Sequence, residues 1–221
     1  MADKEIETAL GVVQNVVFCQ STEESQKNYR KWSTQYDNDM TILGTSNTTK
    51  IVEMFSKLVT DSENFAVLDL GGGTGIAASN LRNHAGFKGE LDILDASIHM
   101  LYEASQKDIN LRNIICHAVT ENGNLPLRDE MYDVIISSGA FLPNHIPASS
   151  IFGIINVIKR GGLLLITRRL KTTEGYGQQF VKNVEKLCSE KKLKYVDHME
   201  YVHFTKVEDK FPSGCFAYQR L

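Results

Sequence analysis

The sequence predicts an α/β fold in which a mostly parallel, seven-stranded sheet is covered by helices on both faces. Three observations lead to this prediction. Short runs of Val, Ile and Leu alternate with helical stretches from Phe65 onward. A glycine-rich turn follows the first of these runs, and the last segments have the pattern of two strands joined by a turn. Strands that alternate with helices pair in parallel and are buried on both faces.

Helices are expected to precede the first strand. Apolar residues at helical spacing predict a first helix at Ile6, Leu10, Val13 and Val17, and a third at Ile51, Phe55, Leu58 and Val59. Between them, Ser21 followed by Glu24 has the form of a capping box. This box predicts the start of a second helix, whose later turns would carry the aromatic residues Tyr29, Trp32 and Tyr36.

The remaining elements follow the βαβ rhythm. We expect strands near 65–70, 91–95, 113–117, 132–138 and 161–168. The intervening helices are expected near 75–84, 98–107, 148–158 and 174–191. The segments Tyr195–Phe204 and Cys215–Leu221 predict a final antiparallel hairpin, turning at Pro212, Ser213 and Gly214. Without repeats or a linker, residues 1–221 are expected to form a single domain, in which 65–221 make the α/β core.

Composition narrows the classes of partner and compartment. The 221 residues carry a formal net charge of −3, which gives no reason to expect a nucleic-acid partner. The pairs Lys191-Lys192 and Arg168-Arg169 are interpreted as solvated charges. The four cysteines form no C-x-x-C pair, so we expect reduced thiols, no metal site and a cytoplasmic protein. No secretory signal or membrane-spanning segment is expected either.

The stretch LDLGGGTG, residues 68–75, is the main candidate for a ligand site. It brings the chain to the carboxyl edge of the sheet, where open parallel sheets bind their ligands. The glycines allow a sharp turn with a ligand against the backbone, and the next helix begins with unpaired N–H groups. A tight turn without a ligand is the alternative interpretation.

Three kinds of ligand could use such a turn. A nucleoside triphosphate requires a lysine and a different glycine spacing. A dinucleotide requires G-x-G-x-x-G, whereas Ile76 stands where the third glycine would fall. Asp69, two residues before Gly71, would be unfavourable beside a pyrophosphate. Its carboxylate instead suits a cationic ligand without phosphate.

Residues 67–75 fit the pattern V-L-D-x-G-x-G-x-G and so resemble the first motif of the class I S-adenosylmethionine-dependent methyltransferases. The resemblance implies a Rossmann-like fold, S-adenosyl-L-methionine as cofactor and S-adenosyl-L-homocysteine as product. It also implies that Asp69 lies by the cofactor's ammonium group. The methionine half would be supported by the turn residues Gly71, Gly72, Gly73, Thr74 and Gly75.

A second motif follows the second predicted strand. Asp95 lies about 20 residues beyond the glycine turn, where one carboxylate can accept hydrogen bonds from two ribose hydroxyls. Asp92 is the rival carboxylate. The tract Asp95, Ala96, Ser97 to Met100 resembles the family pattern D-x-S-x-x-M-L, which implies that Met100 contacts adenine. Helix capping by Asp95 or Ser97 is the alternative.

A third stretch leads into the fourth predicted strand. Leu125-Pro126-Leu127 followed by Tyr132–Ile136 is similar to the family's L-P-F and F-D-x-V patterns. Many relatives carry an aspartate for the adenine amino group upstream, but this chain has His117-Ala118-Val119-Thr120, so Val119 is expected only to line the pocket. Ser137, at the end of this strand, is also expected near the cofactor.

Further tracts resemble a narrower group, the methyltransferase-like proteins of the Williams-Beuren syndrome chromosome region and their animal relatives. The tracts run from Tyr29 to Arg169 and include Y-x-x-W with Tyr36-Asp37. Arg160 replaces the proline of the group's K-P-G-G turn. The resemblance implies that residues 1–60 form a helical lid, in which Tyr29, Trp32 and Tyr36 approach the sulfonium by cation–π attraction. A packed core stripe is the equal alternative.

Methyl transfer is an in-line displacement that depends mainly on alignment of the acceptor. We expect an S-adenosylmethionine-dependent methyltransferase acting on a small-molecule or protein acceptor, without nucleic-acid or membrane partners. His145 is the candidate proton acceptor, with a solvated loop histidine as the alternative. A non-catalytic scaffold that binds the cofactor and activates a partner stays open. A nicotinamide oxidoreductase is disfavoured by Ile76 and by the lack of a Tyr-x-x-x-Lys pair after the fourth strand.

Overall fold

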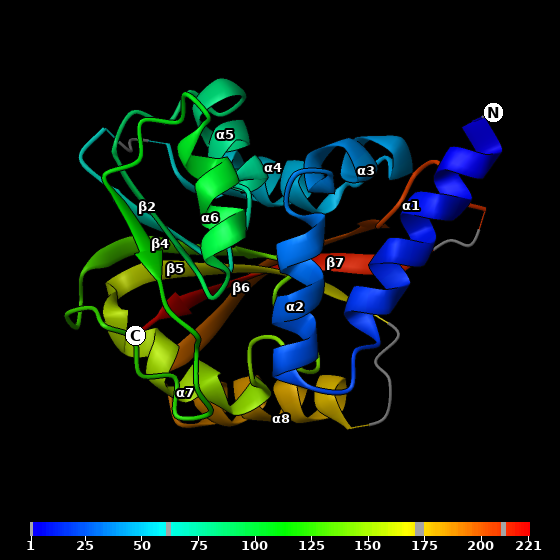
Figure 1. The fold of residues 1–221 in the computed structure, drawn as a ribbon. Helices are drawn as coiled ribbons and strands as arrows, with labels where there is room; N and C mark the ends of the chain where they lie inside the picture. The colour runs from blue at the N-terminus through cyan, green and yellow to red at the C-terminus, as the bar shows by residue number, and fades with distance from the viewer. Residues whose placement is uncertain (1, 61–62, 171–174, 209–210) are drawn as a thin grey trace.

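The computed structural model describes residues 2–60, 63–170, 175–208 and 211–221, and it is built on a seven-stranded sheet (Figure 1). The strand order is β3-β2-β1-β4-β5-β7-β6. Strands β1 to β5 pair in parallel, while β7 runs antiparallel to both β5 and β6. The expected fold is therefore confirmed. The strands are β1 Ala66–Leu70, β2 Glu90–Asp95, β3 Asn113–Cys116, β4 Tyr132–Ser138, β5 Ile158–Arg169, β6 Leu193–Val202 and β7 Pro212–Arg220.

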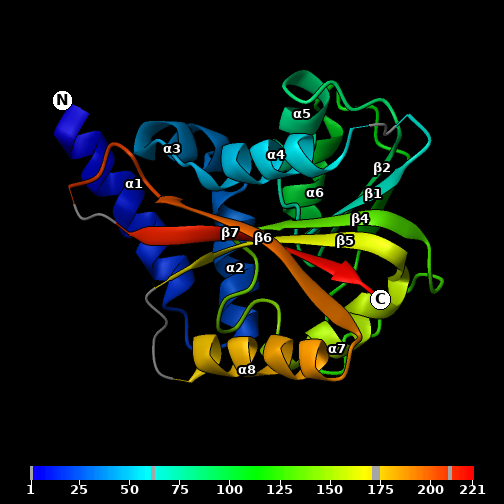
Figure 2. The same ribbon diagram turned by 180° about the vertical axis from the view of Figure 1, so that it is seen from behind.

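Helices cover both faces of this sheet, as the two opposite views show (Figures 1 and 2). On one face lie α4 to α6, and on the other lie α7 and α8. The helices are α1 Ala2–Val17, α2 Thr22–Trp32, α3 Tyr36–Leu43, α4 Asn47–Leu58, α5 Ile76–Asn83, α6 Ile98–Ser105, α7 Ile151–Ile154 and α8 Tyr176–Ser189. Short 3₁₀ turns, Ala148–Ser150 and Ile155–Val157, flank α7, so the helix expected over 148–158 is broken into three pieces. Residue 174, the expected start of the following helix, lies outside the described residues.

The expected second helix is wrong in its extent. It ends at Trp32, and Tyr36 begins the separate helix α3 after a short turn closed by the bond from Gln35 N to Trp32 O. The indole Nε1 of Trp32 then donates to Asp39 Oδ2 at 2.7 Å, which binds the end of α2 to α3. The three aromatic residues therefore come from two helices and not from one helical stripe.

The turn expected at residues 212–214 is also wrong. Pro212 and Gly214 lie within β7, paired with Val202 and Glu200 of β6. Proline is tolerated at the first residue of a strand, and here its carbonyl still accepts from Leu170 N at 2.9 Å. Strand β6 ends at Val202 and β7 begins at Pro212, so the connection between them precedes the expected turn.

Two apolar cores flank the sheet because its central strands are buried on both faces. Every residue of β1 is buried, and most of its side chains are aliphatic. Asp69 is the exception, since this carboxyl group is fully buried within β1. A buried ionisable group near the end of a central strand indicates a functional site at that end of the sheet.

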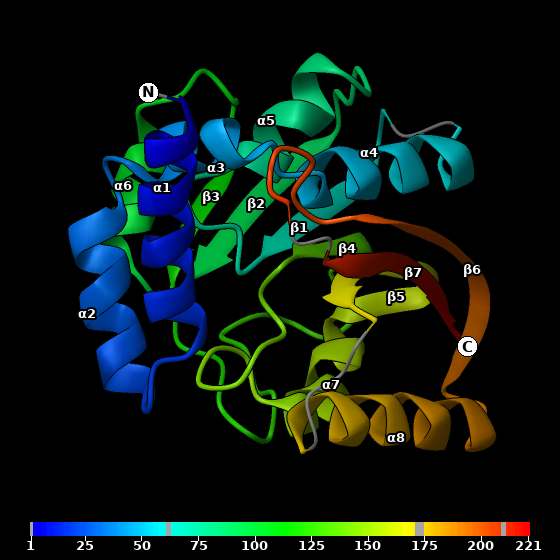
Figure 3. The ribbon, with the colours of Figure 1, turned by 90° about the vertical axis from the view of Figure 1, so that its right-hand side faces the viewer.

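Helices α1, α2 and α3 form a third layer beside the carboxyl ends of the strands (Figure 3). Their apolar side chains pack with Phe204 and Val207 from the β6–β7 connection. Backbone hydrogen bonds join the same segments, from Ser46 N to His203 O and from Thr205 N to Gly44 O. No helix among the described residues is both long and apolar enough to cross a bilayer.

Candidate active site

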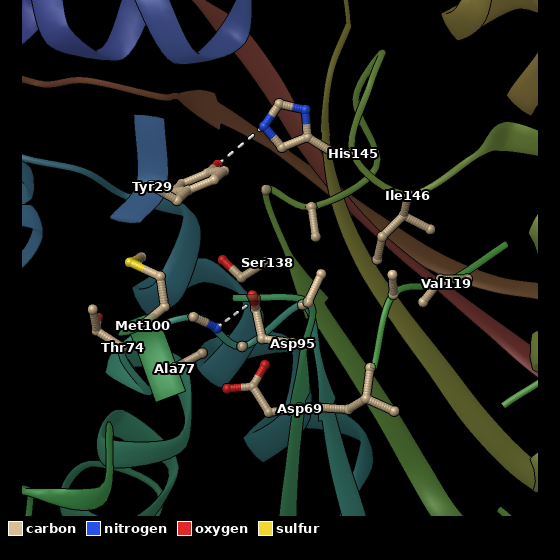
Figure 4. Close-up of a pocket in the computed structure, with 18 of the residues that line it drawn as sticks. Tyr29, Asp69, Thr74, Ala77, Asp95, Met100, Val119, Ser138, His145 and Ile146 are labelled. Atoms are coloured by element: carbon tan, nitrogen blue, oxygen red, sulfur yellow. Dashed lines mark hydrogen bonds between the residues drawn. The ribbon is translucent and has the colours of Figure 1, made fainter. Parts of the chain in front are cut away.

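A cavity lies where the strand order reverses between β1 and β4, and we call it the first cavity (Figure 4). Parallel sheets bind ligands at such a switch point. Its walls come from the ends of β1, β2 and β4 and from α2 and α3. The residues expected from the sequence that line it are Tyr29, Tyr36, Asp69, Gly71, Gly72, Gly73, Thr74, Asp95, Ala96, Met100, Val119 and His145.

Three other expected residues lie behind this lining. Gly75 occupies the N-cap of α5 with φ +77°, where an added Cβ would meet Ile109 Cδ1 at 2.9 Å. Ser97 is buried and caps α6 by accepting from Met100 N. Ser137 is buried and donates its hydroxyl to Leu70 O at 2.8 Å. These residues shape the turn and the strand end without lining the first cavity.

The pleat of β4 explains the exchange of one serine for its neighbour. Successive side chains of a strand point to opposite faces, and the hydroxyl of Ser137 is directed to Leu70 O instead of the first cavity. Ser138 lines the first cavity, in place of Ser137 (Figure 4). The last of the expected residues, Trp32, lines an adjoining cavity that is described below.

The glycine turn is bare because side chains would not fit. Gly71 and Gly73 have φ values of +69° and +56°, which only glycine adopts without strain. An added Cβ at Gly72 would meet Ile93 Cγ1 at 2.6 Å. Gly71 N and Gly72 N both donate to Leu94 O, at 2.7 and 3.2 Å, which fixes the turn against the end of β2. The sequence thus builds an exposed stretch of backbone on the cavity wall.

The carboxyl group of Asp69 is buried in the wall of the first cavity and is only partly hydrogen-bonded. Its Oδ2 accepts from Ala78 N at 3.2 Å, but the buried Oδ1 has no hydrogen-bond partner among the described residues. Burial, opposed by the bond from Ala78 N and aided by the nearby Asp95, raises the pKa of this carboxyl to about 7. A buried carboxylate with a free oxygen is costly unless a cation meets it.

Asp95 and its rival Asp92 have separate roles in the structure. The Asp95 carboxylate accepts from Gly73 N at 3.0 Å and from Ser97 N at 2.8 Å, and burial raises its pKa. It therefore binds the glycine turn to α6 while still lining the first cavity. Asp92 is buried elsewhere, bonded to Arg112 and Tyr132, and does not line this cavity.

Apolar groups line the wall next to Asp95. Met100 is buried in α6, and its Cε lies 3.3 Å from where a Cβ of Gly73 would stand. Ala96, Ala118 and Val119 add small apolar surface to the same cavity. A flat apolar ring system fits such a wall better than a charged group does.

A polar contact secures the glycine turn to α3. The Thr74 hydroxyl donates to Asp37 Oδ1 at 2.5 Å, and the other oxygen of Asp37 forms an ion pair with Lys107. Lys107 Nζ also donates to the Thr74 carbonyl at 2.6 Å. Asp37 therefore links the N-terminal helices to the turn that lines the first cavity.

His145 is held at the far end of the first cavity in one protonation state. Its Nδ1 lies 2.8 Å from Pro143 O and must carry the proton, because a carbonyl only accepts. Its Nε2 is then an acceptor, 3.1 Å from the Tyr29 hydroxyl (Figure 4). The same Nε2 lies 3.4 Å from Ser25 Oγ. Burial lowers the pKa of His145 below its usual 6.5, so the ring is neutral at pH 7.

The rings around His145 come from the N-terminal helices. Tyr29 meets His145 edge-on, with ring centroids 5.5 Å apart, and stacks near Trp32 at 6.1 Å. Trp32 contacts Tyr36 at 4.7 Å across the α2–α3 turn. Burial raises the pKa of both tyrosines above the ordinary value of 10, so their hydroxyls stay protonated.

A second cavity adjoins the first, and sequence reasoning did not anticipate its charge. Arg168 and Arg169, interpreted from the sequence as solvated, are half-buried at the end of β5 and line this second cavity. That interpretation is wrong because the arginines end a central strand beneath the N-terminal helices. Their position at the carboxyl end of a predicted strand, where parallel sheets bind ligands, could have indicated a place in the site. The two cavities share the wall residues Tyr29, Tyr36, Thr48, Ile76, Ser138 and Gly139.

The fold and this site define a class of protein. A Rossmann-like sheet, a glycine turn with buried carboxylates and an adjoining cavity are the arrangement of an α/β methyltransferase. The chain belongs to the ubiE/COQ5 methyltransferase family, whose model matches residues 19–213, and it is a methyltransferase. Comparison with curated protein sequences gave no significant match.

Solved structures of methyltransferases share the fold of this chain. A TehB-like S-adenosylmethionine-dependent methyltransferase from Corynebacterium glutamicum is 15% identical, with TM-score 0.61 over 88% of this chain and 99% of that one. One from Aquifex aeolicus is 19% identical, with TM-score 0.58 over 86% and 98%. A Haemonchus contortus phosphoethanolamine N-methyltransferase, solved with phosphomonomethylethanolamine and S-adenosylhomocysteine, is 15% identical, with TM-score 0.58 over 87% and 60%.

Proposed function

We propose that the chain transfers a methyl group from S-adenosyl-L-methionine, bound in the first cavity, to a small-molecule or protein acceptor in the second. The observation that carries the proposal is the unpartnered Oδ1 of Asp69. The methionine ammonium of the cofactor would supply the missing cation. A dinucleotide or nucleotide would instead bring phosphate toward this carboxylate, which like-charge repulsion opposes.

The other lining residues fit the same cofactor. Asp95 would accept from the ribose hydroxyls, since it lines the first cavity and each of its oxygens can accept a bond beyond the one from Gly73 N or Ser97 N. Met100 and Val119 would contact adenine. The bare backbone of the glycine turn and Thr74 would support the methionine half. When bound, the cofactor supplies an activated methyl group on a positively charged sulfur.

His145 is proposed as the proton acceptor for the methyl-accepting atom. The neutral ring has its basic Nε2 turned toward Tyr29, at the end of the first cavity that adjoins the second. Asn144 fixes this placement, since it holds φ +60° and donates from Nδ2 to Cys19 O at 2.7 Å. The loop is thereby attached to the α1–α2 turn, so the base and the helices above it are held together.

The N-terminal helices are proposed to act as a lid in which aromatic rings face the methyl donor. Tyr29 and Tyr36 line both cavities, so they lie between cofactor and acceptor in this proposal. Their ring faces would attract the sulfonium and exclude water from the transfer path. Holding acceptor and methyl group in line supplies about 7–11 kcal/mol in well-oriented reactions. Beyond this alignment, the proposal requires only His145 to take the proton of the acceptor.

We propose finer assignments on the same basis. The Y-x-x-W tract in α2 and the Arg168-Arg169 end of β5 support placement in the Williams-Beuren chromosome-region group. We propose one domain, residues 1–221, because α1–α3 share a core with Phe204 and Val207. The four cysteines are free thiols, in keeping with a cytoplasmic protein. The net charge of −3 supports an acceptor other than nucleic acid.

Calorimetry with the full chain tests the cofactor, and single-turnover transfer tests the enzyme. S-adenosylhomocysteine should release heat with one site per chain, and NADH should release none. Methyl-labelled cofactor with separated metabolite and protein fractions of a cell extract should label one fraction. Binding with no transfer to any fraction would favour the scaffold alternative over the enzyme.

A further inference from the structure

The two cavities differ in charge, and this difference bears on the acceptor. The first cavity contains the carboxyl groups of Asp69 and Asp95. The second contains Arg168, Arg169 and His203, and none of its described lining residues is Asp or Glu. A cationic ligand suits the first cavity, and an anionic one suits the second.

The two guanidinium groups are fixed in place by aromatic rings. The Cζ of Arg168 lies 4.2 Å from the centroid of the Phe216 ring, and that of Arg169 lies 4.9 Å from the Phe211 ring. Such stacking orients a planar guanidinium while leaving its edge N–H groups free. The arginines are thus held in position before any ligand binds.

Neither guanidinium has an anionic partner in the part of the chain that the structure describes. The polar contact of Arg168 is a long bond, 3.4 Å from Nη1 to Arg169 O, and the described ion pairs include neither arginine. Burial lowers the pKa of both side chains, so their charge is poorly solvated. His203 adds no negative charge and is neutral, because burial and Arg169 lower its pKa to about 3. A half-buried guanidinium without an anionic partner among the described residues favours the binding of an anionic ligand.

Much of the rest of the second cavity is apolar, although Thr45, Asn47, Thr48, Ser138 and Thr167 also line it. Its lining includes Val13, Val16, Trp32, Met40, Phe141 and Phe204. A ligand there buries hydrocarbon against these side chains while its charged end reaches the arginines. The wall shared with the first cavity leaves the other end of such a ligand facing Tyr29 and Tyr36.

We propose that the acceptor is a small organic acid whose carboxylate or phosphate binds Arg168 and Arg169 and whose apolar body fills the second cavity. The inference rests on the proposed methyl transfer and adds the class of the acceptor to it. The anion would position the acceptor through the two guanidinium forks. The methyl-accepting atom would lie at the opposite end of the molecule, toward the shared wall.

Trp32 supplies the assay, because it is the single tryptophan of the chain and lines the second cavity. Its fluorescence would be followed while the full chain, saturated with S-adenosylhomocysteine, is titrated with phenylacetate, phenyl phosphate or the uncharged phenylacetamide. We expect saturable binding of at least one acid, at least about tenfold tighter than the amide, since a charge-assisted hydrogen bond supports that ratio. The tighter of the two acids identifies the preferred anion.

Variants of the arginines test the assignment. Arg168→Gln and Arg169→Gln should each weaken acid binding about tenfold and leave amide binding unchanged. Arg160→Gln, at the solvent-exposed start of β5, is the matched control and should change neither. Arg169→Lys keeps the charge and should retain part of the preference. Unchanged calorimetric binding of S-adenosylhomocysteine shows that each variant is folded.

Three results would overturn the proposal: equal affinity for acid and amide, a preference that survives both glutamine variants, or no saturable response to either acid. Each titration is repeated without S-adenosylhomocysteine. A chain that binds acids at the arginines but releases no heat with S-adenosylhomocysteine would refute the cofactor assignment and leave the anion site standing. The two failures are therefore distinguishable.

Discussion

Binding of S-adenosylhomocysteine should depend on pH through Asp69. The product keeps the amino-acid ammonium, and this cation favours the ionised carboxylate. In the free protein the pKa of Asp69 is raised to about 7, so below that pH the group is protonated and must release its proton before it can pair with the ammonium. Affinity should therefore rise with pH and level off above 7.

The magnitude follows from the raised pKa. With an ordinary value of 3.8 restored in the complex, the dissociation constant at pH 5.5 should be about 30-fold larger than at pH 8. Close to one proton should be released on binding at pH 6. In Asp69→Asn the slope should vanish, and affinity at pH 8 should fall at least about tenfold because a charged partner is lost.

Calorimetry in buffers of different ionisation enthalpy measures both the affinity and the protons released. Asp129→Asn, a change at an exposed carboxylate away from both cavities, is the control and should keep the wild-type slope. A wild-type affinity that is flat between pH 5.5 and 8 would refute the reasoning. So would an Asp69→Asn variant that retains the slope.

Four further expectations follow from the same contacts. The protonated Asp69 carboxyl stabilises the native state, because its pKa is about 7 there against the usual 3.8, and this stability is lost as the pH rises through 7. Asp69→Asn lacks this dependence. Between pH 4 and pH 8, urea unfolding without ligand should therefore show the free energy of unfolding of Asp69→Asn rising by about 4 kcal/mol relative to that of wild type. Gly71→Ala should abolish calorimetric binding of S-adenosylhomocysteine because its Cβ would overlap Ala140, whereas Gly86→Ala, with a similar φ of +66° and no atom within 4 Å, should leave binding intact. His145→Gln should slow single-turnover transfer about 100-fold with little change in cofactor affinity. Wild-type transfer should stay constant from pH 7 upward, because the lowered pKa of His145 keeps the ring neutral. Equal transfer rates in variant and wild type would exclude His145 as the base. Asp37→Ala should free the α3 contact with the glycine turn and increase the S-adenosylhomocysteine dissociation rate in stopped flow, an effect that Asp37→Asn should show only in part.

Much of the sheet could be predicted because burial on both faces leaves a direct trace in the sequence. The β4 run Tyr132–Ser138 is apolar along most of its length, and its predicted bounds match the structure. Helix α3, Tyr36–Leu43, was missed because it is short and begins only a few residues after α2 ends, although the two acidic residues in its first turn are typical of a helix start. The turn before β7 was misplaced because Pro212 and Gly214 are common in turns, while their pairing with β6 depends on residues distant in sequence.

The site was predictable where its chemistry lies within one loop. Asp69 and the glycines that follow belong to one turn, so their spacing carried the information. The sequence did not show which of the two adjacent serines at the end of β4 faces the ligand site, and Ser138 lines the first cavity in place of Ser137. The setting of Arg168 was missed because its ring partner, Phe216, comes from β7, and no local pattern reports such a contact.

The layer above the cavities joins segments far apart in the chain. Thr45 bridges to Phe204, and Gly44 O accepts from Thr205 N at 3.0 Å. During synthesis on a ribosome the helices emerge first, but their partners emerge only after nearly all of the sheet has been made. A growing chain can therefore form its glycine turn early, yet it cannot enclose an acceptor until Phe204 has left the exit tunnel.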